Sequence, residues 1–122
     1  MPKVKPKVIG IVGSRRRDST DDLWACRHKF QEVASGDVRL VSGGCPRGGD
    51  RFAEILAKDF GLTITIHYPD WDTYGKGAGF VRNTKIAEDC NILIAVVAED
   101  RTGGTEDTIK KATKLGKKVY LV

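Results

Sequence analysis

Four short segments of the sequence combine glycine with hydroxyl or charged side chains, a combination suited to binding anions. The first is Gly13-Ser14-Arg15-Arg16-Arg17. Glycine lets the backbone approach a ligand, serine offers a hydroxyl, and arginine binds phosphate oxygens bidentately. A tight turn with its arginines in water is the alternative interpretation. On the ligand-binding interpretation, Gly13, Ser14 and Arg15 contact a phosphate.

The second segment, residues 42–50, reads SGGCPRGGD and contains four glycines in nine residues. So much glycine is entropically costly, and it allows backbone N–H groups to line an anion-binding concavity at a helix N-terminus. The segment matches neither GxxxxGK[ST] nor GxGxxG. The residues predicted to bind phosphate here are Ser42, Gly43, Gly44, Arg47 and Gly48.

Two other residues of this segment each admit two interpretations. Asp50 is a candidate acid-base group, or it caps the helix and orients the loop. Cys45 lies beside the expected helix N-terminus, where a thiolate is stabilised. No histidine or other base is near Cys45 in the sequence, which favours a small packing residue.

The third segment, residues 68–79, is expected to be a long loop rich in aromatic residues and glycine. Trp71 or Tyr74 is a candidate to stack on a base, and Asp70 is a further candidate acid-base group. Alternatively, the loop folds back and its aromatic side chains cover the edge of the core.

Basic and amide side chains lie at the end of this segment and just after it. Lys76 is placed to reach a phosphate, and Arg82 and Asn83 open the next expected helix. Because donors at a helix start face the ligand side of such a sheet, Arg82 and Asn83 are assigned to the site.

The fourth segment is Gly103-Gly104-Thr105, at the start of the last expected helix. It presents free N–H donors and a hydroxyl, which is how many proteins bind phosphate without a metal. A plain glycine-rich cap is the alternative. Glu106, directly after it, is the third candidate acid-base group.

The elements that must position these segments form an alternating pattern of β-branched and helical stretches, which predicts parallel strands joined by crossover helices. Strands are expected at residues 7–12, 38–41, 63–67, 92–97 and 118–122, and helices at 20–34, 49–60, 80–89 and 105–115. Right-handed crossovers favour the strand order 3-2-1-4-5. The first and fourth strands should be neighbours, with the ligand at their carboxyl ends.

Composition is consistent with a single α/β domain spanning residues 1–122, since 122 residues with 40% apolar content suffice for one core. The three cysteines form no CxxC pair, which argues against zinc and for a reducing, cytoplasmic location. The N-terminus is interpreted as leading into the first strand, not as a signal peptide, and no stretch is long enough to cross a membrane. The net charge of +5 suits an anionic partner.

Together, the four segments resemble the SLOG superfamily of Rossmann-like proteins, in its small YspA/YpsA-related branch. The resemblance covers nearly the whole chain, through GSR, SGGCPRGGD, PDWDTYGK before GFVRN, and GGT. It implies a Rossmann-like three-layer sandwich, a nucleotide-type ligand and a homo-oligomer that assembles through helices flanking the sheet.

Two relatives within this superfamily suggest different activities. The core of DprA, which binds single-stranded DNA, is similar at Ser42, Gly43, Arg47, Gly48, Asp50, Arg82 and Asn83. LOG-type phosphoribohydrolases, which cleave nucleoside monophosphates, carry PGGxGTxxE, and this chain is similar at residues 103–105. Three residues after Thr105 it has Thr108, where the LOG motif has glutamate.

Three functions therefore remain open. The first is binding of a nucleotide or nucleotide-derived phosphorylated ligand, with a sensory role. The second is hydrolysis of an N-glycosidic or phosphate bond, with Asp50, Asp70 or Glu106 as the acid-base group. The third, less favoured at a charge of +5, is DprA-like binding of single-stranded nucleic acid. No cofactor or metal is required, although Mg²⁺ can accompany a bound phosphate.

Overall fold

The computed structural model describes residues 6–122, which form a parallel five-stranded sheet in the order β3-β2-β1-β4-β5. This is the order expected from the sequence, and β1 and β4 are neighbours as predicted. The strands are β1 (Lys7–Gly13), β2 (Val38–Ser42), β3 (Ile64–Ile66), β4 (Ile92–Val96) and β5 (Lys118–Leu121).

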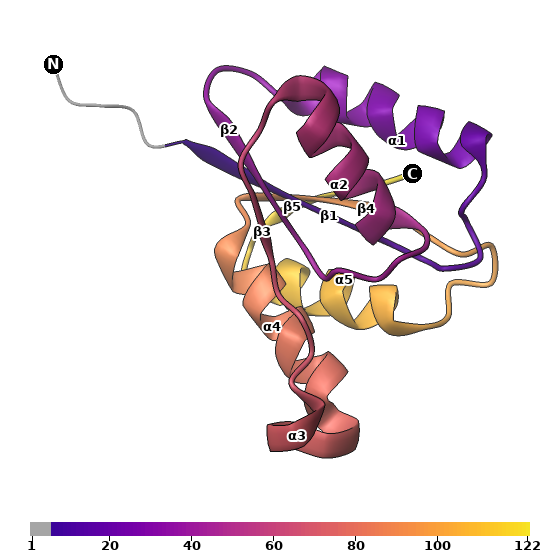
Figure 1. Cartoon of the computed structure of the whole chain (residues 1–122), viewed down its shortest axis with the longest axis vertical. Helices are drawn as coiled ribbons and strands as arrows, with labels where there is room; N and C mark the ends of the chain where they lie inside the picture. Colours follow the sequence, from indigo (N-terminus) through magenta and orange to yellow (C-terminus); the bar gives the residue numbers. More distant parts are fainter. Residues whose placement is uncertain (1–5) are drawn as a thin grey trace, which may run out of the picture.

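Helices cover both faces of this sheet (Figure 1). On one face, α1 (Thr20–Val33) and α2 (Gly49–Phe60) bury Phe30 and Phe52 against Ile9 and Ile11 of β1. On the other face, α4 (Ala78–Asp89) and α5 (Gly104–Lys114) close a second apolar cluster against β4. The three layers make this an α/β Rossmann-like fold, as predicted.

Local signals in the sequence explain where two of these helices begin and end. Ser19 caps α1 by accepting a hydrogen bond from the Asp22 N–H, while the Asp22 carboxylate accepts one from the Ser19 N–H, which is a complete capping box. Gly61 ends α2 in the left-handed conformation, with φ of 64°. That conformation strains residues with a side chain but not glycine.

The expectation of a long loop over residues 68–79 is wrong. The segment contains a short helix, α3 (Trp71–Tyr74), and a 3-10 turn, η1 (Gly75–Gly77), and α4 begins already at Ala78. Asp70 caps α3 by accepting a hydrogen bond from the Thr73 N–H at 3.1 Å. Aspartate before three non-glycine residues is a helix-start signal, which the surrounding glycines obscured.

The N-terminal end of the segment interpreted as leading into β1, residues 1–5, lies outside the described residues. Within residues 6–122, none of the helices has both the length and the apolar character needed to span a bilayer.

Candidate functional site

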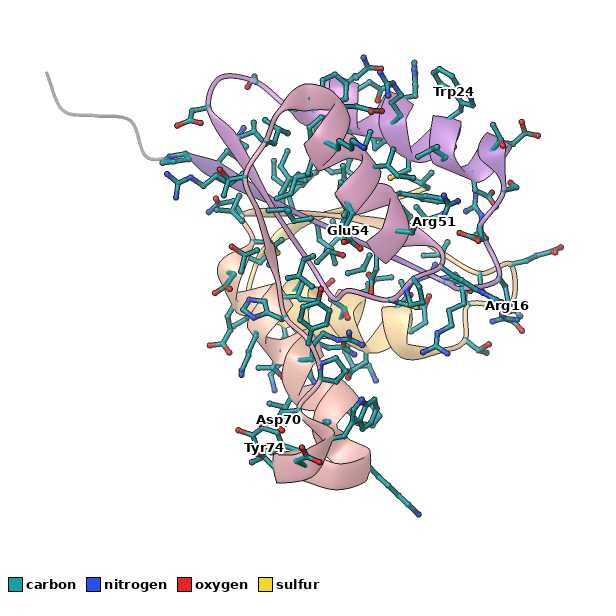
Figure 2. All side chains as sticks on the ribbon, in the orientation of Figure 1. Arg16, Trp24, Arg51, Glu54, Asp70 and Tyr74 are labelled. Atoms are coloured by element: carbon teal, nitrogen blue, oxygen red, sulfur yellow. The ribbon has the colours of Figure 1, made fainter. Side chains whose placement is uncertain are left out.

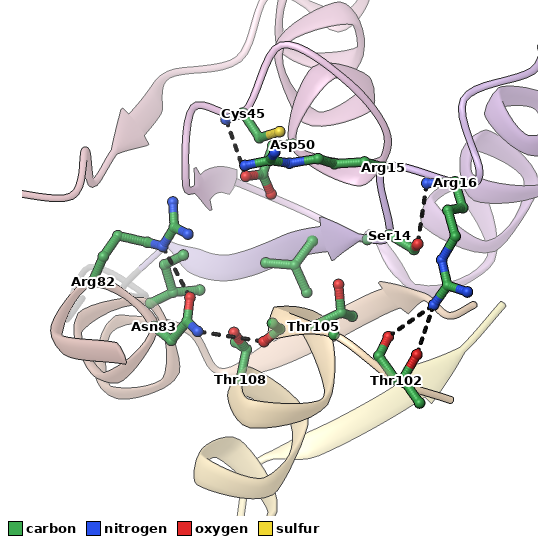
Figure 3. Close-up of a pocket in the computed structure, with 15 residues that line it drawn as sticks. Ser14, Arg15, Arg16, Cys45, Asp50, Arg82, Asn83, Thr102, Thr105 and Thr108 are labelled. Atoms are coloured by element: carbon green, nitrogen blue, oxygen red, sulfur yellow. Dashed lines mark hydrogen bonds between the residues drawn. The ribbon is translucent and has the colours of Figure 1, made fainter. Parts of the chain in front are cut away.

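A pocket of about 420 Å³ opens at the carboxyl ends of β1 and β4, where the strand order reverses (Figure 3). This is where an open α/β sheet binds ligands. Its walls come from the loops after β1, β2 and β4 together with α2, α4 and α5. The lining residues are Val12, Gly13, Ser14, Arg15, Arg16, Cys45, Asp50, Arg82, Asn83, Ile86, Thr102, Gly103, Gly104, Thr105 and Thr108.

Most of the pocket could be expected from the sequence. The residues that were predicted for the site and that line the pocket are Gly13, Ser14, Arg15, Asp50, Arg82, Asn83, Gly103, Gly104 and Thr105. Among the lining residues that were not assigned, Thr108 lies about one helical turn after Thr105, on the same face of α5. That spacing is the signal that could have found it.

The glycines after β2 serve packing. A Cβ atom on Gly49 would lie 2.2 Å from the Val12 carbonyl carbon, and one on Gly48 would lie 2.3 Å from the Ser14 carbonyl oxygen. The N-terminus of α2 therefore contacts the backbone at the end of β1 directly. Contact this close is open only to glycine, so these two residues fix the floor of the pocket.

The glycines after β4 are in the opposite situation. A Cβ on Gly103 or on Gly104 would meet no atom within 4 Å, so no packing within residues 6–122 requires glycine there. Gly103 has φ of 109°, which favours glycine on backbone grounds, whereas Gly104 already belongs to α5. Both line the pocket at the N-terminus of α5, where the first N–H groups of a helix lack the carbonyl partners that later turns have.

Asp50 forms part of the pocket floor and is only 7% exposed. One carboxylate oxygen is 3.0 Å from the Ser42 hydroxyl, and the other accepts a hydrogen bond from the Cys45 N–H at 3.1 Å. Burial raises the pKa of Asp50, although these hydrogen bonds and the nearby Arg82 guanidinium act in the opposite direction. Asp50 therefore orients the loop after β2, one of its two predicted roles, and it also faces the pocket.

Arg82 and Asn83 lie in the second turn of α4 and use their donors within the protein. Arg82 donates to the Gly43 carbonyl oxygen at 2.7 Å and to the Asn83 side-chain oxygen at 2.9 Å. The Asn83 amide donates to the Gly104 carbonyl oxygen and to the Asp107 carboxylate, at 3.3 and 3.1 Å. These two residues connect the loop after β2, α4 and the start of α5, which holds the pocket walls together.

An ion pair closes one side of the rim. The Arg16 guanidinium donates to both oxygens of Asp100 at 2.8 Å and also to the Thr102 hydroxyl and carbonyl oxygen. Arg16 keeps the pKa of Asp100 well below its usual range, so this carboxylate is ionised at neutral pH. The pair joins the loop after β1 to the loop after β4.

Three polar groups of the pocket, the exposed Arg15 guanidinium and the hydroxyls of Thr105 and Thr108, have no hydrogen-bond partner within residues 6–122. Of these three residues Thr108 is the most buried, since it is 1% exposed, and it lines the pocket from α5 (Figure 3). Every fully buried side-chain nitrogen or oxygen among these residues has a partner, so the Thr108 hydroxyl must reach the pocket space.

Five predicted site residues at the end of β2 and in the loop after it do not line the pocket: Ser42, Gly43, Gly44, Arg47 and Gly48. Ser42 is fully buried beneath it, and its hydroxyl contacts the Ile11 carbonyl oxygen at 2.5 Å. Gly44 has φ of 77°, a conformation that favours glycine, and a Cβ there would lie 2.5 Å from the exposed Tyr68 ring. Arg47 is exposed.

The α3 residues lie away from the pocket. Figure 2 shows Asp70 and Tyr74 at the far end of α4, well separated from Arg16 at the rim. Trp71 is 59% exposed and Tyr74 is 47% exposed. Lys76 belongs to η1 and is exposed. None of residues 68–79 lines the pocket, whereas Arg82 and Asn83 of α4 do.

The last acid-base candidate, Glu106, also lies outside the pocket lining. Its two carboxylate oxygens accept hydrogen bonds from Arg101 at 2.8 and 2.9 Å. Glu106 therefore neutralises an arginine of the neighbouring loop, in the first turn of α5 where an acidic residue also complements the helix dipole.

The fold and the pocket define a Rossmann-like α/β protein with a polar site at the point where its strand order reverses. The Gene 61 protein of Mycobacterium phage D29 is 30% identical to this chain over 112 residues, which are 87% of the chain and 88% of that protein. The chain belongs to the same family as this Gene 61 protein. No described family model matches the sequence.

Solved structures with the same fold include molybdenum cofactor proteins. The molybdenum cofactor carrier protein of Chlamydomonas reinhardtii matches with a TM-score of 0.72 and 26% identity, covering 96% of this chain and 76% of that one. The molybdenum cofactor binding protein of the phototrophic bacterium Rippkaea orientalis matches with a TM-score of 0.75 and 22% identity, covering 98% of this chain and 77% of that one.

Proposed function

We propose that this protein binds a small phosphorylated ligand, a nucleotide or a nucleotide-derived compound, with its phosphate at the N-terminus of α5. The observation that carries the proposal is the Thr108 hydroxyl, which is 1% exposed, lines the pocket and has no hydrogen-bond partner within residues 6–122. Because this hydroxyl reaches the pocket space, a bound phosphate oxygen can accept its hydrogen bond.

The surroundings of Thr108 are suited to an anion. The N-terminus of α5 lies at the pocket, and the helix dipole adds a partial positive charge there. Arg15 supplies a full positive charge on the opposite wall, from the loop after β1. Gly103 and Gly104 leave the space that a phosphate needs against the backbone. A pocket of about 420 Å³ is within the usual range for small-molecule sites.

A molybdenum cofactor is the second candidate ligand. The similarity to the carrier protein of Chlamydomonas reinhardtii, at 26% identity over 96% of this chain, favours it. This cofactor carries a phosphate group, so the same anion site serves both candidates. The two ligands differ in the group that must fill the rest of the pocket, beside Asp50 and Cys45.

The finer expectations from the sequence become parts of this proposal. The protein is a single-domain member of the YspA/YpsA-related branch of the SLOG superfamily, acts in the cytoplasm and forms a homo-oligomer. It binds its ligand without a required metal, with Mg²⁺ able to accompany the phosphate. Asp50 is the only one of the three acid-base candidates that lines the pocket, so a hydrolytic activity, if one is found, depends on it.

The test is ligand binding by Thr108→Val and by the natural chain. Valine has nearly the shape of threonine and removes only the hydroxyl. Thermal unfolding and calorimetric titration would be recorded with nucleoside mono- and diphosphates, ribose 5-phosphate, molybdenum cofactor and a short single-stranded DNA. A ligand at about 100 times its Kd stabilises the native state by about 2.7 kcal/mol. We expect one small phosphorylated compound to do this in the natural chain and to bind about tenfold more weakly to Thr108→Val.

Thr113→Val is the matched control, because Thr113 lies on the same helix and is exposed. It should bind like the natural chain. Equal affinity of all three proteins would contradict the placement of the phosphate at α5. Stabilisation by DNA alone, lost at higher salt, would instead indicate the nucleic-acid function.

A further inference from the structure

The charges of the pocket are arranged so that one guanidinium faces the ligand without a protein partner. Three arginines line the pocket: Arg15, Arg16 and Arg82. Arg82 donates to Gly43 and lies close to Asp50. Arg15 and Arg16 belong to the loop after β1 and differ in their hydrogen-bond partners. This difference determines which of the two charges is available to bind an anion.

Arg16 is occupied by the protein itself. Its two terminal nitrogens each donate to an oxygen of Asp100 at 2.8 Å, and one of them also donates to the Thr102 hydroxyl and carbonyl oxygen. Asp100 is held in place as well, because it accepts hydrogen bonds from the Thr102 N–H and hydroxyl, at 3.2 and 2.8 Å. The pair is thus a defined arrangement in which two loops meet, and its net charge is zero.

Arg15, next to it in the chain, makes no ion pair within residues 6–122. Together with the N-terminus of α5, it forms one cationic place for an anion. A phosphate monoester carries a charge of about −1.5 to −2 at neutral pH, which Arg15 and the helix dipole complement. A second phosphate group on the ligand would find Arg16 already neutralised by Asp100.

We propose that Asp100 restricts the pocket to ligands with a single phosphate group, because it neutralises Arg16 in an ion pair and so withholds that cation from a second phosphate. This inference rests on the proposed function and names the class of its ligand as phosphate monoesters. Asp100 is a specificity-determining residue that acts through Arg16. It disfavours diphosphates, triphosphates and dinucleotides, in which a second phosphate group adjoins the first.

The test uses the full chain and pairs of probes that differ by one phosphate group: inorganic phosphate against pyrophosphate, and AMP against ADP. Calorimetric titration at fixed, low salt measures both Kd values in a pair. The natural chain should bind the single phosphate more tightly. Asp100→Asn keeps an oxygen for the Thr102 N–H and removes the charge, so it should improve the affinity for the diphosphate relative to the monophosphate by about three- to tenfold.

Two further variants make the result specific. Glu99→Gln is the matched control, because it removes a charge from the neighbouring exposed position, and Glu99 makes no ion pair within the described residues. It should leave the affinity ratio unchanged. Arg16→Gln leaves Asp100 without its cation and should shift the ratio in the opposite direction, further against the diphosphate. This variant also tests the inference if Asp100→Asn does not fold.

Each outcome has a definite meaning. Opposite shifts in Asp100→Asn and Arg16→Gln, with no shift in Glu99→Gln, support the inference. Binding with the same ratio in all four proteins, or an equal shift in Glu99→Gln and Asp100→Asn, overturns the inference and leaves the proposed function intact. No binding of any phosphate compound to the natural chain overturns the proposed function, and the inference with it.

Discussion

The hydroxyl of Ser42 lies 3.0 Å from a carboxylate oxygen of Asp50, in a region that is almost closed to solvent. The same hydroxyl is 2.5 Å from the Ile11 carbonyl oxygen. A hydroxyl has one proton, and both of these neighbours are acceptors when Asp50 is ionised. A protonated Asp50 that donates to Ser42, while Ser42 donates to Ile11, satisfies all three groups. Burial, which raises the pKa of Asp50, favours the same state.

This relationship predicts the pH dependence of Asp50→Asn. The folded-state pKa of Asp50 is raised above its unfolded value. Asp50 therefore stabilises the folded state at low pH, and this stabilisation is lost as the pH rises through the folded-state pKa. Asparagine can donate to Ser42 at every pH. The melting temperature of Asp50→Asn should therefore rise relative to the natural chain as the pH increases, which thermal unfolding between about pH 4 and 8 would measure.

Asp18→Asn is the control, because the stability that Asp18 provides should depend on pH in the opposite direction. Asp18 accepts hydrogen bonds from the Gly48 N–H and from Arg51, both at 2.7 Å, and these lower its pKa. Its contribution is present above the unfolded-state pKa and is lost as the pH falls through the folded-state pKa. The natural chain should be more stable than Asp18→Asn near neutral pH, and this difference in stability should disappear in acid. Equal trends in the two variants would contradict the protonation state assigned to Asp50.

Gly49→Ala should be strongly destabilising. The new Cβ would lie 2.2 Å from the Val12 carbonyl carbon, and neither backbone can move without separating α2 from β1. We expect a loss of about 3 kcal/mol or more in the free energy of unfolding, measured by urea denaturation, or failure to fold. Gly77→Ala is the control, because a Cβ there meets nothing within 4 Å. A cost below about 1 kcal/mol for Gly49→Ala would refute the close contact.

Gly104→Ala should increase the stability of the protein and at the same time weaken ligand binding. Gly104 is the first residue of α5, and a Cβ there meets no atom within 4 Å, so the fold should be retained and stabilised by about 0.5–1 kcal/mol. The new methyl group lies beside the N–H donors at the pocket, so the affinity for a phosphorylated ligand should fall. Urea denaturation and calorimetric titration of the same preparation measure the two effects. Unchanged affinity would show that the ligand does not approach this turn.

Asn83→Ala should weaken the connection between α4 and α5. Asn83 is 6% exposed, and its amide bonds both the Gly104 carbonyl oxygen and the Asp107 carboxylate. Removing the Asn83 amide leaves the Gly104 carbonyl oxygen and the Asp107 carboxylate without this donor, which should lower the free energy of unfolding by about 1–3 kcal/mol. Hydrogen exchange should increase most at the start of α5. Thr84→Ala, at the next position of α4, is a control with one local hydrogen bond to lose and should cost less.

Much of this fold could be predicted because its signals are local. The bounds of α2 were predicted to the residue, since an apolar stripe at helical spacing lies between a glycine-rich start and Gly61. The strand order followed from the handedness of crossovers. Residues 68–79 were mistaken for a loop, because α3 has only four residues and glycine at position 75 suggested coil.

The pocket was predictable in outline but not in its contacts. Arg16 and Asp100 are 84 residues apart, and nothing in the composition of either loop pairs them. The sequence alone does not distinguish a glycine that packs against a neighbouring backbone, as Gly49 does, from one that leaves open space, as Gly104 does. The two cases differ only in what surrounds the missing Cβ, so the sequence of the second glycine-rich segment could not show that Gly48 and Gly49 pack against neighbouring backbone.

The contact between Gly49 and the end of β1 has a consequence for how this family can diverge. The floor of the pocket is made of touching main chains, so almost any substitution there damages folding before it changes recognition. The rim is made of side chains in two loops, where an exchange such as one at Asp100 leaves the sheet untouched. New ligand preferences in this family should therefore arise by change at the rim, above a floor that selection for folding keeps constant.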